Sequence, residues 1–313
     1  KKDDLVLDIG GNDGTQMLQY KKAGMRNVLN VESAKNISKI SKNNGVNTIN
    51  DFFNLKVAKK RIGKNSVSLI NASGVFFHLE ELHSVIKGIN YCLKSDGILI
   101  IQFMYAGAMI DKLLFDGIYH EHLCLYTLKS LTFLLKQYDL EIFDAYYADI
   151  HSGSIIAKVS KKKSKLNKKT KRFKKAIENF KKYNLKSILN FSQKVKKRKK
   201  EIFNYIYKLK KNYDAKIYCY GAPAKGNTLL NYIGIKSDLI QKCVEINPLK
   251  TGLYMPKSHI PIVKESQNDL PDYYLLLSHN FEKEIIKKNK NILKKGVNFI
   301  NLFPKIKLIK KKK

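Results

Sequence analysis

The fold is decided by the stretch LVLDIGGNDGT, residues 5–15. Its first five residues, apolar except for Asp8, predict a short buried strand, and the glycines that follow predict a tight turn before a helix. Strand, glycine turn and helix in this order begin the nucleotide-binding folds, because glycine lets the backbone approach a ligand and the free helix amides favour an anion. We therefore expect a cofactor to be bound here by Asp8, Gly10, Gly11, Asn12, Asp13 and Gly14.

Side chains after the next three predicted strands support this prediction. The second strand ends at Glu32, where a carboxylate can accept both hydroxyls of a ribose. Asp51 and Phe52 follow the third strand and offer an acceptor for an adenine amino group beside an aromatic ring. A strand end with a core phenylalanine is the alternative for this pair. Ser73 follows the fourth strand, and we expect it to contact the same cofactor.

The spacing from the glycine turn to Glu32 suits either a dinucleotide or S-adenosylmethionine. The turn lacks the Gly-x-Gly-x-x-Gly pattern of dinucleotide folds. An aspartate just before the turn, here Asp8, is a common feature of methyltransferase strands. We therefore predict that the cofactor is S-adenosyl-L-methionine. A nicotinamide-dependent oxidoreductase is the alternative from another class of enzyme.

Composition limits the class of protein. With 313 residues, of which 44% are hydrophobic, the chain can fill the cores of two domains. The longest apolar run, 97–110, is shorter than the ~20 residues of a membrane-spanning helix, so we expect no membrane partner. Four widely separated cysteines without a Cys-x-x-Cys pair predict a reducing, cytoplasmic setting and no metal in this chain.

The formal net charge of +34 would ordinarily indicate a nucleic acid or an anionic surface as partner. The lysines, however, are spread along predicted helical faces in a chain rich in Lys, Asn, Ile and Tyr, a composition typical of an AT-rich genome. We therefore expect no nucleic acid partner. A basic nucleic-acid-binding protein is the alternative, and it predicts affinity that falls steeply with salt.

A cluster of ionisable side chains, YHEH at 119–122, follows the carboxyl end of the fifth predicted strand, 97–103. Ligands of open parallel sheets bind at that end of the strands. Neutral imidazole is well suited to accept a proton near neutral pH, so the cluster indicates proton abstraction. A surface turn or a structural hydrogen-bonded cluster is the alternative.

The remaining pattern divides the chain into three parts. Predicted strands at 140–147 and 155–159 form an antiparallel hairpin, and a Lys-rich stretch with Phe, Ile, Leu and Tyr at helical spacing follows. We expect an α/β protein with a class I methyltransferase Rossmann-like domain at 1–159, an amphipathic helical linker at 160–212, and a second, C-terminal Rossmann-like domain at 213–313.

A second nucleotide-type unit supports the last of these domains. A predicted strand at 215–220 runs into GAPAKGNT, residues 221–228, and then into a helix. Lys225 and the free amides of this turn would suit a diphosphate, although glycine turns are also common without a ligand. The next strand ends at Glu245, as the corresponding strand of the first unit ends at an acid.

Three motifs, YHEH at 119–122, GAPAKGN at 221–227 and SHNF at 278–281, follow the glycine turn at 10–14. Together they resemble the sugar-nucleotide C-methyltransferase family over nearly the whole chain. The resemblance implies that S-adenosylmethionine methylates a carbon next to the ketone of a nucleoside-diphosphate 4-keto-deoxysugar. It also implies that the sugar nucleotide, with thymidine diphosphate as the expected nucleotide, is held between the two domains.

The same resemblance implies roles for individual residues. His122 would be the general base, Glu121 and Tyr119 would orient it or stabilise the enolate, and His78 would lie near the sugar. His120 would be structural. The expected substrate-binding residues are Tyr105, His151, Ser154, Gly221, Ala222, Lys225, Gly226, Asn227 and Glu245.

The chain departs from the family pattern in three places. The family usually begins with a cysteine-rich zinc module and a tyrosine-bearing segment, which this sequence does not contain, so we expect either a piece of a longer protein or a natural short form. Ser73-Gly74 stands where many members have Asn-Asn, and Ile155-Ile156 where an arginine is often found. The sugar, the nucleotide base, the ring carbon and the choice between monomer and homodimer stay open. An O- or N-methyltransferase is the neighbouring alternative.

Overall fold

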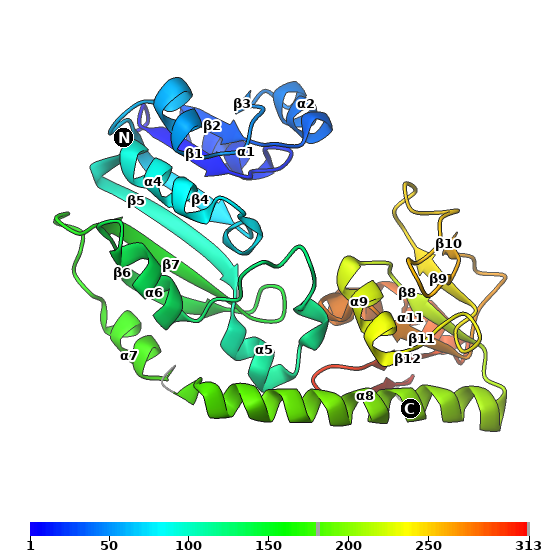
Figure 1. The fold of residues 1–313 in the computed structure, drawn as a ribbon. Helices are drawn as coiled ribbons and strands as arrows, with labels where there is room; N and C mark the ends of the chain where they lie inside the picture. Colours follow the sequence, from blue (N-terminus) through cyan, green and yellow to red (C-terminus); the bar gives the residue numbers. More distant parts are fainter. Residues whose placement is uncertain (180–181, 312–313) are drawn as a thin grey trace. The chain divides into compact units, whose positions relative to one another are not determined.

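The computed structural model describes residues 1–179 and 182–311, which divide into two compact units (Figure 1). The N-terminal unit consists of Lys1–Gly107 and Glu121–Lys182. The C-terminal unit consists of Ala108–His120 and Tyr183–Lys313. The chain therefore crosses from one unit to the other three times, and the first two crossings enclose a segment of thirteen residues, 108–120.

A seven-stranded sheet forms the centre of the N-terminal unit, in the order β3-β2-β1-β4-β5-β7-β6. The first five of these strands run parallel, and β7 is antiparallel to both β5 and β6. The predicted α/β fold and the closing hairpin are confirmed. The strands are β1 Leu5–Ile9, β2 Val28–Val31, β3 Asn47–Ile49, β4 Val67–Ser73, β5 Leu93–Met104, β6 Leu140–Ala148 and β7 Ser154–Lys161.

Apolar side chains join the helices of this unit to the sheet. Parallel strands are buried on both faces, and β1 and β2 are accordingly buried along almost their whole length. Met17 of α1 packs with Val6 and Val28 in one core cluster. The helical segments are α1 Thr15–Lys22, α2 Lys35–Asn43, α3 Leu55–Val57, the π-helical turn η1 Ala58–Ile62, the 3-10 turn η2 Phe76–His78, α4 Leu82–Cys92, α6 Leu128–Lys136 and α7 Lys171–Asn179.

Two boundaries differ from those that the sequence pattern predicts. The pattern predicts a strand from Gly97, but β5 begins at Leu93, which pairs with Val67 before an irregularity shifts the register. The pattern also predicts a helix from Leu79, but Leu79 is extended and α4 begins at Leu82. The 3-10 turn η2 occupies the positions before it, so His78 lies on a turn rather than in front of a continuous helix.

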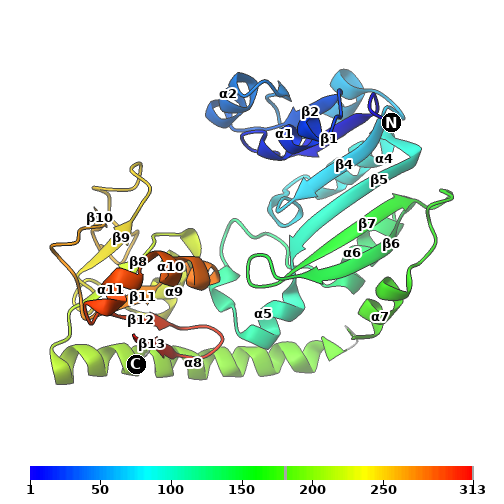
Figure 2. The same cartoon turned by 180° about the vertical axis from the view of Figure 1, so that it is seen from behind.

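A six-stranded sheet forms the C-terminal unit, in the order β10-β9-β8-β11-β12-β13 (Figure 2). Only β13 pairs antiparallel among the described strands of this sheet. The strand order reverses between β8 and β11, and such a switch point is where open parallel sheets bind ligands. The predicted second Rossmann-like fold is confirmed. The strands are β8 Ile217–Tyr220, β9 Lys242–Glu245, β10 Ile262–Lys264, β11 Tyr273–Leu276, β12 Asn298–Asn301 and β13 Lys307–Ile309.

The C-terminal unit contains a helix of 29 residues, α8 at Leu185–Tyr213. Asn184 caps its first turn, because its side chain accepts from the Ser187 amide and the Ser187 hydroxyl accepts from the Asn184 amide in return. One face of the helix is buried, through Phe191, Val195, Ile202, Ile206 and Leu209. The other helical segments of the unit are α9 Ala224–Ile233, the 3-10 turn η5 His279–Phe281, α10 Glu282–Lys288 and α11 Lys290–Lys294.

The segment Ala108–His120 follows β5 in the chain but belongs to the C-terminal unit. It contains most of α5, Ala106–Lys112, and the 3-10 turn η3, Phe115–Gly117. The Phe115 ring lies 5.4 Å, between ring centroids, from both Tyr232 of α9 and Phe303. The residues directly before the Tyr-His-Glu-His motif are thus anchored by aromatic packing within this unit.

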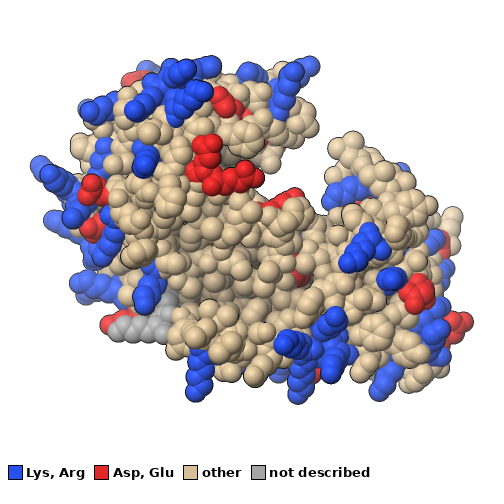
Figure 3. All heavy atoms as spheres, in the orientation of Figure 1, with Lys and Arg blue, Asp and Glu red and all other residues tan. Residues whose placement is uncertain are grey.

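The basic residues are distributed over the surface. On the face in Figure 3, lysine and arginine side chains are spread over both units rather than gathered in one band. This distribution agrees with a general excess of lysine along the chain. Among the residues that the structure describes, no helix is both long enough and apolar enough to cross a membrane.

Candidate active site

The first glycine turn is held by side chains from neighbouring strands. Gly10 adopts a φ of +65°, a conformation that favours glycine. The amide of Gly11 donates to Asn30 Oδ1 at 3.1 Å. A Cβ on Gly11 would lie 2.6 Å from Asp8 Oδ2 and would also overlap Asn30 Oδ1. Close packing at Gly11, and the backbone conformation at Gly10, therefore explain why glycine occupies both positions.

Asp8 is buried at the carboxyl end of β1, directly before this turn. Burial raises the pKa of its carboxyl group to about 7, and the negative charge of Glu32 adds to the rise. The group therefore changes its charge near neutral pH. A cationic ligand group beside it would favour the ionised form.

Glu32 is oriented by the backbone on both sides of it. Its two carboxylate oxygens accept from the amides of Asn12 and Ala34, at 3.0 and 2.9 Å. Asn50 donates to the carbonyl oxygen of Glu32 as well, at 2.9 Å. A carboxylate in a fixed orientation with further lone pairs is suited to accept hydroxyl groups of a ligand.

A cavity of about 430 Å³ lies beside the turn. Gly10, Asp51, Phe52 and His78 line it, together with Ile9, Val31, Ser33, Phe53, Asn54, Val75, Leu79, Glu80, Glu81 and Val85. The volume is that of a ligand site, and the lining is mostly apolar with a few polar groups. Phe52 is 73% exposed, so its ring is available to a planar ligand group rather than buried in the core.

A second cavity, of about 400 Å³, also has Gly10 in its lining. It is lined by Asp8, Gly10, Gly11, Asn12, Asp13, Thr15, Gln16 and Ser73. The two cavities share Gly10, so a ligand could extend along the turn from one to the other. Apart from Gly14 and Glu32, every residue that the sequence suggests for cofactor binding lines one of the two. Thr15 and Gln16, in the first turn of α1, also line the second cavity. The sequence pattern does not identify them as binding residues, because the glycines mark the turn and not the helix residues that reach a ligand.

The structure brings two histidines of the N-terminal unit together. The rings of His78 and His122 lie 5.1 Å apart, between centroids, and Phe77 packs against both at 4.4 and 4.8 Å. Nδ1 of His78 donates to the carbonyl oxygen of Glu121 at 2.6 Å, which leaves Nε2 as the acceptor in the neutral ring. Because His78 also lines the larger cavity, the histidine pair adjoins it.

The Tyr-His-Glu-His motif crosses from one unit to the other. Tyr119 and His120 belong to the C-terminal unit, where their ring centroids lie 5.9 Å apart. Glu121 and His122 belong to the N-terminal unit. The four residues therefore link the two units within one short stretch of chain.

Three expected substrate-binding residues of the N-terminal unit lie in or near the β6–β7 hairpin. Ser154 is fully buried, and its hydroxyl accepts from Gln102 at 2.7 Å and donates to the Ile150 carbonyl at 2.9 Å. Tyr105 is also buried, and its amide donates to Gly153. His151 lies in the turn with a φ of +51° and is exposed. Of the three, only His151 presents its side chain to solvent.

The second glycine turn, in the C-terminal unit, is equally close-packed. Gly221 has a φ of +84°, and a Cβ there would lie 3.2 Å from Ser278 Cβ and would overlap its hydroxyl. A Cβ on Gly226 would lie 2.7 Å from Leu277 Cβ. Because neither glycine has a side chain, the turn and α9 can pack closely against Leu277 and Ser278, which follow β11.

Glu245 organises the amides around this turn. Its carboxylate accepts from the amides of Ala222, Ile246 and Asn247 at 2.8 to 3.0 Å. Burial opposes its ionisation, but these hydrogen bonds and the nearby Lys250 together lower the pKa of its carboxyl group. Glu245 is thus ionised, and it fixes the turn in the way that Glu32 does in the first unit.

A cavity of about 340 Å³ lies at the carboxyl ends of β8, β9 and β11. It is lined by Tyr220, Gly221, Val244, Glu245, Ile246, Ser278, Phe281, Glu284, Ile285 and Lys288. Among the expected substrate-binding residues, Gly221 and Glu245 line it, whereas Ala222, Lys225, Gly226 and Asn227 belong to the adjoining turn and α9. Asn227 Oδ1 accepts from Asn231 at 3.1 Å.

A buried pair in the C-terminal unit has no counterpart in the sequence-based site. His279 donates through Nε2 to Asp116 Oδ2 at 2.8 Å. His279 occurs within the SHNF motif and Asp116 lies three residues before the YHEH motif, and the two residues are 163 positions apart. No local pattern relates two side chains at such a separation, so the sequence alone gave no reason to pair them.

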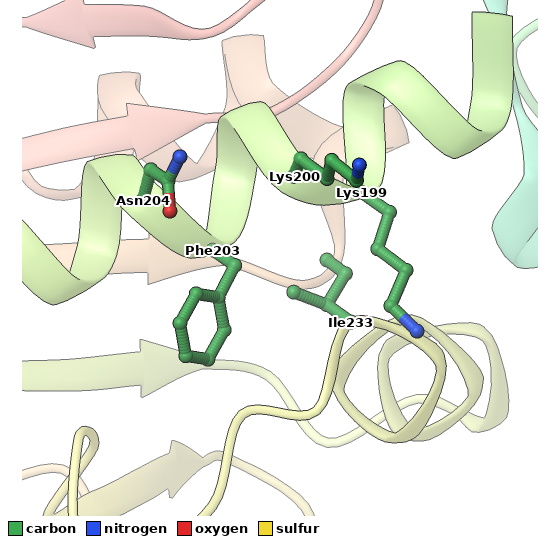
Figure 4. Close-up of a pocket in the computed structure, with 5 residues that line it drawn as sticks. All are labelled: Lys199, Lys200, Phe203, Asn204 and Ile233. Atoms are coloured by element: carbon green, nitrogen blue, oxygen red, sulfur yellow. The ribbon is translucent and has the colours of Figure 1, made fainter.

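A further hollow, of about 350 Å³, lies on α8. It is lined by Lys199, Lys200, Phe203 and Asn204 of α8 and by Ile233 at the end of α9, and Figure 4 shows Lys199 and Phe203 on either side of Ile233. Its lining holds no acid, histidine or glycine turn, so it lacks the groups that line the cavities at the two glycine turns. In the described part of the chain, no group of three or more His, Cys, Asp or Glu residues is arranged to hold a metal ion.

Two solved structures that resemble part of this chain are described as methyltransferases. A putative S-adenosylmethionine-dependent methyltransferase from Listeria monocytogenes is 12% identical, with a TM-score of 0.41, over 50% of this chain and 91% of its own. A geranyl diphosphate C-methyltransferase from Streptomyces coelicolor A3(2) is 9% identical, with a TM-score of 0.42, over 51% of this chain and 73% of its own. These similarities are low, and the assignment of the chain rests on its sequence relatives.

Two protein families and one curated relative match almost the whole sequence of the chain. Residues 1–145 match the family described as a methyltransferase domain. Residues 149–304 match the family described as the C-methyltransferase C-terminal domain. The C-methyltransferase NovU of Streptomyces niveus is 29% identical, over 98% of this chain and 74% of that protein.

Proposed function

Since the chain belongs to the S-adenosylmethionine-dependent C-methyltransferases that join a methyltransferase domain to a C-methyltransferase C-terminal domain, we propose a specific reaction for it. The acceptor is a carbon next to the ketone of a keto-deoxysugar that is linked to a nucleoside diphosphate. The general base is His122. Thymidine diphosphate is the proposed nucleotide.

The chemistry of this reaction sets three requirements. A carbon next to a ketone is a poor nucleophile until it is deprotonated, so the site needs a base and a group that stabilises the enolate oxygen. It also needs a cofactor held in line with the reacting carbon. S-adenosylmethionine supplies an electrophilic methyl group, whose bond to sulfur breaks as the new carbon–carbon bond forms, leaving S-adenosylhomocysteine.

The contact between His122 and His78 is the observation that carries the proposal. It supports an imidazole base beside the cavity at the glycine turn, because His78 lines that cavity and packs against His122. His122 takes the proton from the substrate carbon and becomes an imidazolium, while the electron pair moves to the ketone oxygen. Neutral His78, which donates through Nδ1 to the Glu121 carbonyl, presents Nε2 as an acceptor to a sugar hydroxyl.

Glu121 and Tyr119 are proposed to assist the base. Glu121 is adjacent to His122 in the chain and stabilises the imidazolium that forms by its negative charge. Tyr119 lies three residues before His122 and donates its hydroxyl proton in a hydrogen bond to the enolate oxygen. His120 has no chemical role in this scheme.

The residues of the first turn fit S-adenosylmethionine. The two cavities share Gly10 of the turn. The turn is packed so closely that a Cβ on Gly11 would overlap Asp8 and Asn30. Glu32, held by two amides, is proposed to accept the ribose hydroxyls, and Asp51 with Phe52 to hold the adenine. Asp8 is proposed to bind the amino acid part, whose ammonium would favour the ionised form of the carboxyl group.

The second turn is proposed to bind the nucleoside diphosphate. Amides at the beginning of α9 and the ammonium of Lys225 suit the phosphates, and Glu245 is proposed to accept the ribose hydroxyls, as Glu32 is proposed to do in the first unit. The cavity of about 340 Å³ next to Gly221 gives room for a nucleotide. The topology of the sheet supports nucleotide binding in this cavity. The strand order reverses between β8 and β11, whose carboxyl ends adjoin the cavity, and open parallel sheets bind ligands at such a switch point.

Solvent exchange tests the role of His122. The protein is incubated with S-adenosylhomocysteine and a panel of thymidine-diphosphate keto-deoxysugars in deuterated water, and the loss of the carbon-bound proton next to the ketone is followed by proton NMR. We expect the wild type and the His83→Asn control to exchange it. His83 is an exposed histidine of the same unit, paired with Tyr138.

The His122→Asn variant should exchange at least about 100-fold more slowly, which is the usual contribution of a general base. Calorimetry with S-adenosylhomocysteine shows whether the variant keeps its cofactor site. Exchange at the wild-type rate by a His122→Asn protein that binds S-adenosylhomocysteine normally would rule out His122 as the base.

A further inference from the structure

A buried ionisable pair lies in the C-terminal unit outside the residues assigned a chemical role. Asp116 comes from the 3-10 turn η3 and His279 from the 3-10 turn η5, and His279 Nε2 donates to Asp116 Oδ2 at 2.8 Å. Their side chains are 1% and 5% exposed. A carboxylate is rarely buried to this degree without a partner, so the pair is a specific feature of the fold.

Aromatic side chains enclose this pair. The Phe303 ring lies 4.6 Å from the His279 ring, between centroids, and Phe115 lies 5.4 Å from Phe303. Tyr232 of α9 packs on Phe115 at the same distance. Water is therefore kept from the carboxylate, and the polar contacts that remain to Asp116 determine where η3 can lie.

Lys225 supplies a positive charge to the same carboxylate. The turn η3 packs against α9, the helix that carries Lys225. Burial lowers the pKa of the Lys225 ammonium, and the negative charge of Asp116 opposes that shift. Asp116 Oδ1 is buried and accepts no hydrogen bond from the described residues. Lys225 stands in the first turn of α9, within the second glycine turn.

We propose that Asp116 and His279 are positioning residues that fix the segment Ala108–His120, and with it Tyr119, against the nucleotide-binding turn at Lys225. Tyr119 follows Asp116 by only three residues, so fixing Asp116 restricts where the Tyr119 hydroxyl can lie. Lys225 belongs to the turn that is proposed to hold the diphosphate and to α9, against which η3 packs, so a bound nucleotide and the Tyr119 segment would lie at the same end of α9. This inference rests on the proposed function.

Hydrogen–deuterium exchange of the whole chain tests the anchoring directly. We expect Asp116→Ala and His279→Asn to raise amide exchange at 114–120 at least tenfold, while Asp116→Asn, which can still accept from His279, stays within about threefold of the wild type. Matched controls in the same unit are the exposed residues Asp238 and His259, as Asp238→Ala and His259→Asn. Exchange at 114–120 that is the same in all the variants would overturn the proposal.

Thymidine diphosphate adds a second readout. We expect it to slow exchange at 114–120 in the wild type and in Asp116→Asn, but not in Asp116→Ala, because only the first two keep the segment on the turn. If Asp116→Ala loses protection throughout β11 and β12, and so does not fold, His279→Asn takes its place, since its side chain is too short to donate to Asp116 Oδ2 as Nε2 of His279 does. Slowing of equal size in Asp116→Ala or His279→Asn would contradict the proposal.

Kinetics separate positioning from folding. With an accepted keto-sugar substrate, we expect kcat to fall at least tenfold in His279→Asn, with KM and the Kd of S-adenosylhomocysteine within about threefold of the wild type. Recovery of kcat in Asp116→Asn relative to Asp116→Ala would support positioning, and an unchanged kcat in His279→Asn would overturn it. If the wild type transfers methyl to no keto sugar, the proposed function fails, and the exchange measurements still decide the anchoring.

Discussion

At the scale of single residues, the raised pKa of Asp8 predicts that cofactor binding depends on pH. Its pKa is raised to about 7, so the carboxyl is mostly protonated at pH 6 and mostly ionised at pH 8. The ionised fraction rises from about one tenth to about nine tenths over this range. Because the ionised form attracts the ammonium of S-adenosylhomocysteine, we expect its affinity to rise up to about tenfold from pH 6 to pH 8.

Isothermal calorimetry at several pH values checks this prediction. The Asp8→Asn variant should bind more weakly than the wild type at pH 8, and its affinity should vary little with pH. An affinity of the wild type that stays constant or falls from pH 6 to pH 8 would show that Asp8 does not pair with the ligand.

Gly11 offers a second test at this scale. Its φ is not in the left-handed region, so an alanine there is excluded by space alone: the Cβ would lie 2.6 Å from Asp8 Oδ2. We expect Gly11→Ala to lower the affinity for S-adenosylhomocysteine at least about tenfold, because one displaced charged contact is worth more than 1.4 kcal/mol. Gly45→Ala adds backbone strain at a φ of +80° but meets no atom within 4 Å, so it should keep the affinity even where it lowers the stability. Wild-type affinity in Gly11→Ala would contradict the placement of the cofactor.

The position of a residue in the fold could be predicted where the neighbouring sequence marks it as a strand end or a turn. It could not be predicted where it depends on contacts between distant parts of the chain. Asp8, the glycines that follow it and Glu32 stand at strand ends, and a strand end in a parallel sheet already indicates which edge a side chain occupies. The pairing of Asp116 with His279 depends on how two distant turns meet in the folded chain, and nothing near either residue encodes it.

At the scale of elements, α8 is a structural part of the C-terminal unit rather than a charged arm. Ile202 on its buried face is 0% exposed, whereas Ile188 near its beginning is 53% exposed. We expect Ile202→Ala to lower the free energy of unfolding by about 2–5 kcal/mol and Ile188→Ala by less than about 0.5 kcal/mol. Urea denaturation followed by tyrosine fluorescence measures both. Equal effects of the two substitutions would show that the helix does not pack as described.

The elements themselves were largely predictable, because their apolar runs are long and end at glycine or polar turns. β1 has the same bounds in the sequence pattern and in the structure. The beginning of β5 was not predictable, because it depends on an irregular register with β4 rather than on side-chain pattern. The 3-10 turn η2 before α4 was missed for a similar reason, since a single turn has no periodicity.

At the scale of the whole molecule, the two units should respond separately to the two ligands. S-adenosylhomocysteine at 100 times its Kd adds about 2.7 kcal/mol to the stability of the part that binds it. We expect it to slow amide exchange in β1, β2 and β4, and thymidine diphosphate to slow exchange in β8, β9 and β11. Hydrogen–deuterium exchange with each ligand alone measures this. Protection of β8 and β11 by S-adenosylhomocysteine alone would contradict the assignment of ligands to units.

The division into two α/β folds follows from two strand, glycine turn and helix patterns, and the sequence therefore predicts it. The placement of Ala108–His120 in the C-terminal unit does not follow from any pattern, because the segment lies between elements of the first sheet in the chain. Its packing through Phe115 depends on Tyr232 and Phe303, which come much later in the sequence.

The central claim is that a methyl group is transferred to a carbon next to a ketone, and the position of the methyl group in the product tests it most directly. The wild type is incubated with methyl-carbon-13 S-adenosylmethionine and thymidine-diphosphate 4-keto-deoxysugars, and the product is examined by carbon-13 NMR. We predict a labelled methyl group bonded to a ring carbon adjacent to the ketone. A labelled methyl group on oxygen or nitrogen, or no labelled product from any of these sugars while S-adenosylhomocysteine still binds, would contradict the account.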